Sequence, residues 1–406
     1  MIYKSRINNT PVYFQASNSL PMVDIQLNFR AGSAFDGNLH GLADIAVGMF
    51  ATQTKSLSEQ ELINKITDIG ASIHAETSKE YFVIKVRILN DTDIIEQTTD
   101  LLREIFANPN FDSDILDREK QQSLTNINYL RQQPGYLASL EFSRTLFANN
   151  PYGEPTIGHK ESVSTISIDD IKNFFNKYIC ANNTNICIVG DITEHASKII
   201  AEELINSLSD GAKNIQTFPQ EPIETQIVNK KFESKQTSIL LGHQLFLNID
   251  DPLYFPLKLG NEILGGGGLN SLFFNKVREE LGLVYNIGSS VSINPDYGSF
   301  IISAQTSNPA LALETINEVY REFVASTIDD TTLKNSKNHI EGTHLLSSVK
   351  NSSKLSMLSS IANKSLELDF FDTYVDNINS VTSEDIKDAF TAIQHNQSLT
   401  VMVGDI

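Results

Sequence analysis

The sequence SIDDIKNFFNKYICANNTNICIVGDI, residues 167–192, recurs at the end of the chain as TSEDIKDAFTAIQHNQSLTVMVGDI, residues 382–406. A single one-residue gap aligns the two copies, and agreement of this length is not expected by chance. Self-similarity at a long spacing is the signature of a repeated structural unit. The pair therefore indicates that one unit of structure occurs twice in the chain.

Two further pairs of similar segments occur in the same order. GASIHAETSKEYFVIKVRI, which starts at Gly70, resembles NIGSSVSINPDYGSFIISAQ, which starts at Asn286. LLREIFANPNFDSDILDREKQQSLTNI from Leu101 resembles VYREFVASTIDDTTLKNSKNHIEGTHL from Val319.

Between the copies lies the polar stretch SDGAKNIQTFPQEPIET, which has no apolar period and is typical of an exposed connection. We predict a domain over residues 1–208, a linker over 209–225 and a second domain over 226–406.

Apolar periodicity within each copy predicts both strands and helices. The alternation in residues 23–29 and 82–88 predicts half-buried strands. Helices are predicted over residues 57–68 and 169–178, each opened by a serine with an acidic residue three positions later. Strands in pairs followed by runs of helices favour an α+β fold. We expect two homologous domains, each an antiparallel sheet with helices packed on one face.

Composition excludes several classes of protein. The 406 residues are 40% hydrophobic and 20% charged, which is typical of a globular protein and not of a disordered chain. The 31 Lys and Arg against 50 Asp and Glu give a net charge of -19, so we expect no nucleic-acid binding. No apolar stretch is long enough for a membrane span. The two cysteines, Cys180 and Cys187, are too few for a disulfide framework.

The segment FRAGSAFDGNLHGLADIAVGMFATQT, residues 29–54, begins at the end of the half-buried strand predicted over residues 23–29. Together with Asn150-Pro-Tyr-Gly-Glu-Pro, Val189-Gly190-Asp191 and LGGGGLNSLFFNKVREELGLVY at 264–285, it resembles the pitrilysin/insulinase superfamily of zinc peptidases, which includes the mitochondrial processing peptidase. The resemblance covers essentially the whole chain. It implies the duplicated metallopeptidase-like fold.

The resemblance also implies where a catalytic zinc would be bound. Family members carry an inverted H-x-x-E-H motif on a helix and a Glu ligand on a later helix. The corresponding positions here are Asp44, Val47, Gly48 and Asn126. Valine cannot activate water, glycine has no ligand, and an Asp with an amide cannot complete the three-ligand set of a catalytic zinc. We therefore expect no metal and no catalytic residue in this chain alone.

The second copy retains residues that the resemblance assigns to substrate binding. Arg278 and Tyr285 in REELGLVY match the pair with which catalytic members hold the peptide opposite the zinc. The alternative is that Arg278 pairs with Glu279 or Glu280 and Tyr285 packs in a strand. Gly265, Gly266, Gly267 and Gly268 resemble the glycine-rich loop of the non-catalytic processing-peptidase subunit. We expect them to form a mobile rim for peptide binding, with a flexible connector as the alternative.

The resemblance therefore implies the non-catalytic subunit of a heterodimeric, bacterial-type zinc metalloendopeptidase. Zinc is expected in a homologous partner subunit that bears the intact motif, and the substrate is expected to be a peptide. One alternative is a structural scaffold, and another is a peptide-binding pseudo-peptidase with no catalytic partner. A third is an autonomous enzyme with rebuilt metal ligands. The bacterial pairs suggest a periplasmic setting, with the cytoplasm as the alternative.

Overall fold

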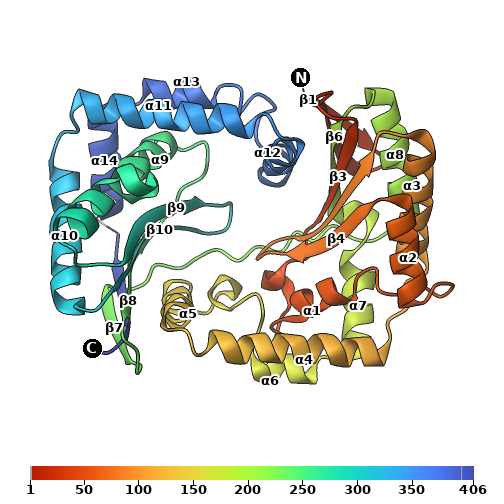
Figure 1. Cartoon of the computed structure of the whole chain (residues 1–406), viewed down its shortest axis with the longest axis horizontal. Coiled ribbons are helices and arrows are strands. Elements are labelled where there is room, and N and C mark those ends of the chain that lie inside the picture. The colour runs from red at the N-terminus through yellow and green to blue at the C-terminus, as the bar shows by residue number, and fades with distance from the viewer. Residues whose placement is uncertain (1, 395) are drawn as a thin grey trace. The chain divides into compact units, whose positions relative to one another are not determined.

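The computed structural model describes residues 2–394 and 396–406. Met1, in the predicted first domain, and His395, in the repeated segment, lie outside the described residues. The chain forms two compact units, and each unit is assembled from three separate stretches of sequence (Figure 1). Unit 1 consists of Met1–Ile127, Pro155–Gln216 and Leu346–Phe371, and unit 2 consists of Asn128–Glu154, Thr217–Leu345 and Asp372–Ile406.

A six-stranded sheet in the order β1-β2-β6-β3-β5-β4 forms the centre of unit 1. Its strands are β1 (Ile2–Ile7), β2 (Thr10–Ala16), β3 (Met22–Phe29), β4 (Ser72–Thr77), β5 (Phe82–Leu89) and β6 (Thr184–Gly190). Neighbouring strands are antiparallel except β2 and β6, which are parallel. The prediction of a purely antiparallel sheet is therefore wrong at this pair. Because β2 and β3 run in opposite directions, a strand inserted between them must be parallel to one of them.

Unit 2 repeats this topology in a five-stranded sheet of order β7-β11-β8-β10-β9. Its strands are β7 (Gln226–Lys231), β8 (Thr237–Gln244), β9 (Asn286–Ile293), β10 (Gly298–Thr306) and β11 (Ser398–Gly404). β11 is parallel to β7 and antiparallel to β8, as β6 is to β2 and β3. In each unit the inserted strand comes from the repeated segment. The α+β fold with two homologous domains is confirmed.

The helices of unit 1 follow the predicted boundaries where local capping determines them. They are α1 (Leu42–Met49), α2 (Glu59–Ile69), α3 (Thr92–Ala107), most of α4 (Ser113–Leu130), α6 (Lys160–Thr165), α7 (Ile168–Tyr178), α8 (Glu194–Ser207) and α12 (Asn351–Lys364), with short 3-10 turns η1 (Ser33–Phe35) and η3 (Ala181–Asn183). Ser58 with Glu61 opens α2, and Ser167 with Asp170 opens α7, each as a reciprocal capping box. These two helix predictions are confirmed.

Helix α12 covers the face of the unit 1 sheet that lies opposite α3 and α8 (Figure 1). Its apolar side chains Leu355, Leu358 and Ile361 pack on Tyr13, Cys187 and Val189 in one buried cluster. The prediction of helices on one face only is therefore wrong for this unit.

Strand β3 is correspondingly buried on both faces, so the prediction of a half-buried strand is also wrong there. Gln26 and Asn28, the polar members of its alternating pattern, are 6% and 1% exposed. The Gln26 Nε2 atom donates to Ser359 Oγ on α12 at 2.8 Å and to Asn28 Oδ1 at 2.7 Å. The covering helix supplies the hydrogen bonds that water would otherwise supply, which permits polar side chains on a buried face.

In unit 2, α5 packs against β8 and β11. The helical elements of this unit are α5 (Pro134–Leu146), α9 (Tyr254–Asn261), α10 (Pro309–Ala325), most of α11 (Asp330–Ser347), α13 (Tyr374–Ser380) and α14 (Ser383–Gln394), the π-helical turns η4 (Glu262–Gly266) and η6 (Phe274–Glu280), and the 3-10 turns η2 (Pro151–Gly153) and η5 (Gly268–Asn270). β8 is buried along its whole length, and Gln244 donates to the Leu146 carbonyl of α5 at 2.6 Å. A Cβ at Gly242 would collide with the Phe300 carbonyl and press on the Phe142 ring, so this position requires glycine.

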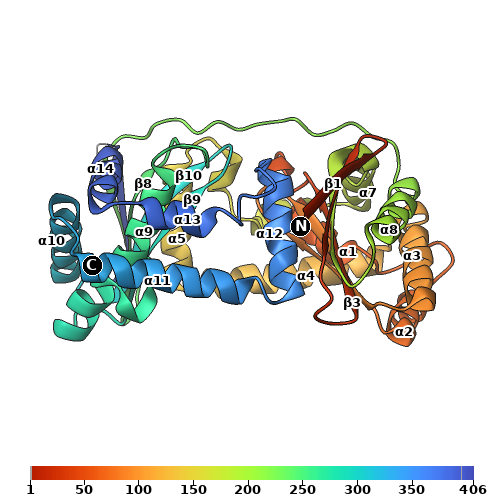
Figure 2. The same cartoon turned by 90° about the horizontal axis from the view of Figure 1, so that it is seen from above.

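The compact units differ from the predicted domains by two exchanged helices. α12 is encoded in the second half of the sequence and belongs to unit 1, whereas α5 is encoded in the first half and belongs to unit 2. Residues 210–225, within the predicted linker, form no helix or strand (Figure 2). No helix in the described part of the chain is both long and apolar enough to cross a membrane.

The exchange of helices predicts that neither half of the chain folds alone. A fragment of residues 1–216 lacks α12 and would expose Tyr13, Cys187, Gln26 and Asn28 to water. We expect it to be aggregated or to melt without a cooperative transition, while co-expression with residues 217–406 restores a soluble complex that co-purifies and melts cooperatively. The measurement is size-exclusion chromatography with circular dichroism melting. A monomeric 1–216 fragment with a cooperative melt would contradict this expectation.

Candidate functional site

Helix α1 is anchored at its start by a buried aspartate. The Asp36 carboxylate accepts hydrogen bonds from the backbone N–H groups of Gly41 at 2.8 Å and Ala43 at 3.0 Å. These are amides of the first helical turn, which have no partner inside a helix. Burial nevertheless raises the pKa of Asp36 to about 7, against the lowering effect of the amide hydrogen bonds. Sequence reasoning did not identify this residue.

The four positions that correspond to the zinc site lie in unit 1. Asp44, Val47 and Gly48 are on α1 and are partly buried, whereas Asn126 is exposed on α4. Burial raises the pKa of Asp44 to about 6, and its carboxylate accepts no hydrogen bond from any described residue. α1 therefore carries a single poorly solvated carboxylate where a zinc peptidase carries two histidines and a glutamate.

Glu119 on α4 occupies the space beside Gly48. A Cβ at Gly48 would overlap the carboxylate of Glu119, so a histidine could be placed there only if Glu119 moved. Glu119 lies two helical turns before Asn126 on the same face of α4, which is the only sequence signal that could have identified it. A catalytic zinc needs three protein ligands, and these residues do not supply them. Among residues 2–394 and 396–406, no group of three or more His, Cys, Asp or Glu is arranged to hold a metal ion.

Arg278 and Tyr285 lie in unit 2, on either side of the turn that leads into β9. Arg278 is exposed on η6, and its guanidinium lies over the Phe274 ring at 4.8 Å. No ion pair joins it to Glu279, Glu280 or another acid in the described part of the chain. Tyr285 is 59% exposed, and its backbone N–H donates to the Gln305 carbonyl at 2.8 Å. Both polar side-chain ends are therefore available to a ligand.

The four glycines form helical turns instead of an extended loop. Gly265 and Gly266 end η4, and the Gly267 N–H donates to the Glu262 carbonyl at 2.8 Å. A Cβ at Gly265 would collide with the Ser289 backbone nitrogen of β9. One at Gly266 would collide with the Asn261 side chain at the end of α9, and one at Gly267 with the Glu262 carbonyl of η4. Gly268 has a φ of 61°, which glycine adopts without strain. Gly265, Gly266 and Gly267 therefore serve close packing and Gly268 serves a left-handed turn, and these observations give no support to a mobile rim.

The π-helical turns η4, which ends in the glycine run, and η6, which carries Arg278, both contact β9, and Tyr285 directly precedes this strand. π-helical turns are rare and occur frequently at functional sites, because the widened turn redirects side chains. At η4, the Glu262 Oε1 atom lies 2.6 Å from the Nδ1 atom of His339 on α11, which is hydrogen-bonding distance. The structure thus brings together the predicted residues of the second copy within unit 2.

Two family models match the chain. Residues 12–160 match a model described as insulinase, peptidase family M16, and residues 165–340 match one described as the peptidase M16 inactive domain. The chain is 26% identical over 402 residues to the non-peptidase homolog YmxG of Helicobacter pylori, covering 97% of this chain and 91% of that protein.

A crystal structure described as the peptidase M16 inactive domain from Pseudomonas fluorescens superposes with a TM-score of 0.95 at 28% identity, covering 100% of this chain and 98% of that one. A probable mitochondrial-processing peptidase subunit beta of Arabidopsis thaliana is 24% identical over 217 residues, covering 53% of this chain and 40% of that protein. The similarity therefore extends to chains described as inactive and to a chain named as a peptidase subunit.

The contact between Gly48 and Glu119 predicts a measurable coupling. In a Glu119→Ala background, Gly48→Ala should stabilise the protein by roughly 0.5–1 kcal/mol, because alanine is the better helix former. In the native background this gain should be lost, since the Glu119 side chain must move. Urea unfolding of the two single variants and the double variant gives the coupling energy. Equal effects of Gly48→Ala in both backgrounds would show that Glu119 does not fill the ligand space.

The raised pKa of Asp44 predicts a pH-dependent stability difference. Because the folded-state pKa of about 6 lies above the ordinary value of 3.8, the stability from the protonated carboxyl is complete below pH 4 and is lost as the pH rises to 6. Asp44→Asn should therefore match the native chain at pH 4 and exceed its stability by roughly 2 kcal/mol at pH 8. Urea titrations at both pH values measure this. Asp117→Asn, at an exposed position, should change little at either, and an Asp44→Asn effect independent of pH would refute the argument.

Proposed function

The chain belongs to the pitrilysin/insulinase family of peptidases, family M16, as an inactive member, and on this premise we propose that it is the zinc-free subunit of a two-chain metalloendopeptidase. In this proposal a homologous partner contributes the zinc and its ligands. This chain contributes peptide binding and stabilisation of the transition state. Alone it cleaves nothing.

The observation that carries the proposal is the solvent exposure of the polar side-chain ends of Arg278 and Tyr285. An arginine presents a planar fork of donors that suits a peptide carbonyl or a terminal carboxylate. A phenol hydroxyl can donate to a carbonyl oxygen as it becomes an oxyanion. In this chain both groups are exposed, and no described residue forms a hydrogen bond or ion pair with either polar end, so a peptide would not have to displace an internal polar partner.

The zinc and its activated water would have to come from another chain. Val47 cannot act as a base, and Glu119 fills the space of the missing ligand at Gly48. Val47 and Gly48 supply neither a base nor a metal ligand, so the chemistry that the family performs is incomplete here. The similarity to a chain named as a subunit of a processing peptidase supports division of the site between two chains.

We expect the peptide to bind in an extended conformation by adding a strand to a sheet edge. β4 is an edge strand that pairs only with β5, which leaves its outer backbone groups unpaired within unit 1. At β9, an edge strand of unit 2, Gly265 lies against the Ser289 backbone nitrogen, so part of that edge is already covered. β4 is therefore the better candidate for strand addition in this chain.

Peptide cleavage by the purified chain, alone and mixed with a zinc-motif homologue encoded beside it, tests the proposal. We expect cleavage only in the mixture, and its abolition by a zinc chelator. Tyr285→Phe should lower kcat by about 10²-fold, as loss of an oxyanion donor does. Arg278→Ala should raise KM by about tenfold, because it removes a charge-assisted hydrogen bond to the substrate.

Arg321→Ala serves as the matched control, because Arg321 is an exposed arginine of the same unit. Among the described residues it donates a hydrogen bond only within its own helix, to the Asn317 carbonyl. It should leave kcat and KM unchanged. Chelator-sensitive cleavage by the chain alone would overturn the argument that it lacks a zinc site. A mixture whose activity is indifferent to both Arg278→Ala and Tyr285→Phe would instead show that this chain does not contribute to the reaction.

A further inference from the structure

Unit 1 contains a polar cavity of about 680 Å³ on the sheet face that α12 partly covers. β1 and β2 form one wall, the end of α12 forms another, and linker residues 211–213 close a third side. The volume is in the range of ligand-binding pockets. β1 has no counterpart in the five-stranded sheet of unit 2, so the cavity belongs to unit 1 only.

The charge of this cavity is opposite to that of the chain. Of the described residues that line it, Lys4, Arg6, Arg30 and Lys213 are cationic and none is acidic. The whole chain has 50 acidic residues against 31 basic ones. At physiological salt, charges beyond about 8 Å are screened, so a ligand in the cavity experiences these cations more than the net charge of -19.

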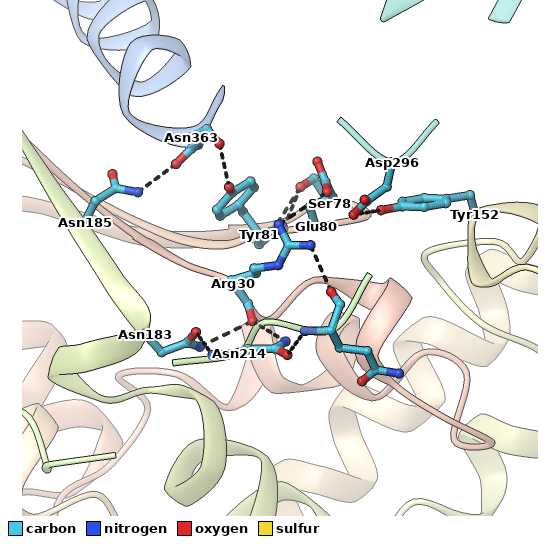
Figure 3. Close-up of polar contacts among 11 residues, drawn as sticks. Arg30, Ser78, Glu80, Tyr81, Tyr152, Asn183, Asn185, Asn214, Asp296 and Asn363 are labelled. Atoms are coloured by element: carbon cyan, nitrogen blue, oxygen red, sulfur yellow. Dashed lines mark hydrogen bonds and ion pairs between the residues drawn. The ribbon is translucent and has the colours of Figure 1, made fainter. Parts of the chain in front are cut away.

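Three of the four cations have no acidic partner within the described residues. Lys4 and Arg6 alternate along β1 and therefore project on the same face, with the Lys4 ammonium 5.4 Å from the Tyr13 ring centroid. Lys213 is exposed on the linker. Arg30, in contrast, forms an ion pair with Glu80 at 3.7 Å and donates to the Gln216 carbonyl at 3.0 Å, so its charge is already compensated (Figure 3).

The floor and wall of the cavity are held by asparagine side chains. Asn28 donates to Asn185 at 2.8 Å. Asn185 in turn donates to Asn363 at 2.9 Å (Figure 3). Asn182 donates to the Gly211 carbonyl at 2.8 Å, and Asn214 donates to the Arg30 carbonyl at 3.0 Å. These bonds fix the linker beside the sheet, so the backbone that carries Lys213 is held at the cavity before any ligand arrives.

Charged residues on an edge strand can also serve only to prevent aggregation. That role requires cations along the outer edge of β1, but it does not require a cavity with no acid in its lining. Nor does it explain the network that fixes Lys213 opposite β1. Both features are expected if the cations converge on a bound anion.

We propose that this cavity is a subsite for the carboxylates of an acidic peptide segment, recognised by Lys4, Arg6 and Lys213. The inference rests on the proposed peptide-binding function and adds a preference to it. In an extended peptide, every second side chain lies on the same face. Lys4 and Arg6 are also two positions apart on a strand, so their spacing equals that between such side chains. Acidic residues at alternate positions would therefore each meet a cation.

Fluorescence anisotropy with the purified full chain tests the subsite. The probes are a short labelled peptide with alternating Glu residues and the same peptide with Gln at those positions. We expect the Glu peptide to bind about tenfold more tightly, with an affinity that falls as salt is raised. Lys4→Gln/Arg6→Gln/Lys213→Gln should remove this difference.

The matched control is Lys65→Gln/Lys160→Gln/Lys172→Gln, which changes the net charge equally at exposed lysines of unit 1 outside the cavity. It should keep the tenfold preference. Equal binding of the two peptides, or a preference that survives the loss of the three cavity cations, would overturn the subsite. Binding of inorganic phosphate that depends on Lys4, Arg6 and Lys213, with no binding of either peptide, would also overturn it, because the cavity would then be a phosphate site.

The subsite and the proposed subunit function can fail separately. Arg278→Ala should leave the Glu-peptide preference intact, because Arg278 belongs to unit 2. If no mixture with a zinc homologue cleaves peptide but the preference is present and lost in the triple variant, the subsite stands and the catalytic partnership fails. If cleavage occurs but shows no preference for the Glu peptide, the partnership stands and the subsite fails.

Discussion

The central strands of each sheet in this chain are buried on both faces, and the second face is covered by a helix that the other half of the sequence encodes. α12 packs on the sheet of unit 1 and α5 on that of unit 2. In unit 1 the contact is partly polar, since Gln26 and Asn28 depend on Ser359 for hydrogen bonds. A buried amide without a hydrogen-bond partner raises the free energy of the folded state by more than an apolar contact lowers it. These hydrogen bonds therefore select α12 as the covering helix and also hold it in place. The cavity of unit 1 therefore exists only when both halves are present.

Local signals in the sequence predicted local structure well. Serine with an acidic residue three positions later predicted the starts of α2 and α7, because both partners of a capping box lie within one turn. The repeat predicted that two homologous domains share one topology. The burial of Gln26 could not be predicted, because it depends on Ser359, which is distant in sequence. For the same reason Glu119 was missed beside Gly48, and no periodicity connects those two positions.

The glycine run shows the limit of reasoning from residue type at the candidate site. Glycine permits flexibility and also permits close approach of two backbones, and the sequence does not distinguish between these uses. Gly265 lies against Ser289, which is a contact with a strand formed by later residues. Arg278 and Tyr285, by contrast, were identified by resemblance and lie exposed. Exposed side chains of this kind add little to the free energy of folding, so packing does not account for their presence.

The binding preference of this chain depends on local charge more than on its net charge. A net charge of -19 favours basic ligands at long range, and in dilute salt this attraction would dominate the encounter. At physiological ionic strength it is screened within about 8 Å, so the sign of charge in each cavity decides what binds there. Lys4, Arg6 and Lys213 line the cavity of unit 1, and no described residue that lines it is acidic. The cavity therefore favours the binding of carboxylates. A peptide with both signs of charge could thus be attracted by its basic residues and retained by its acidic ones.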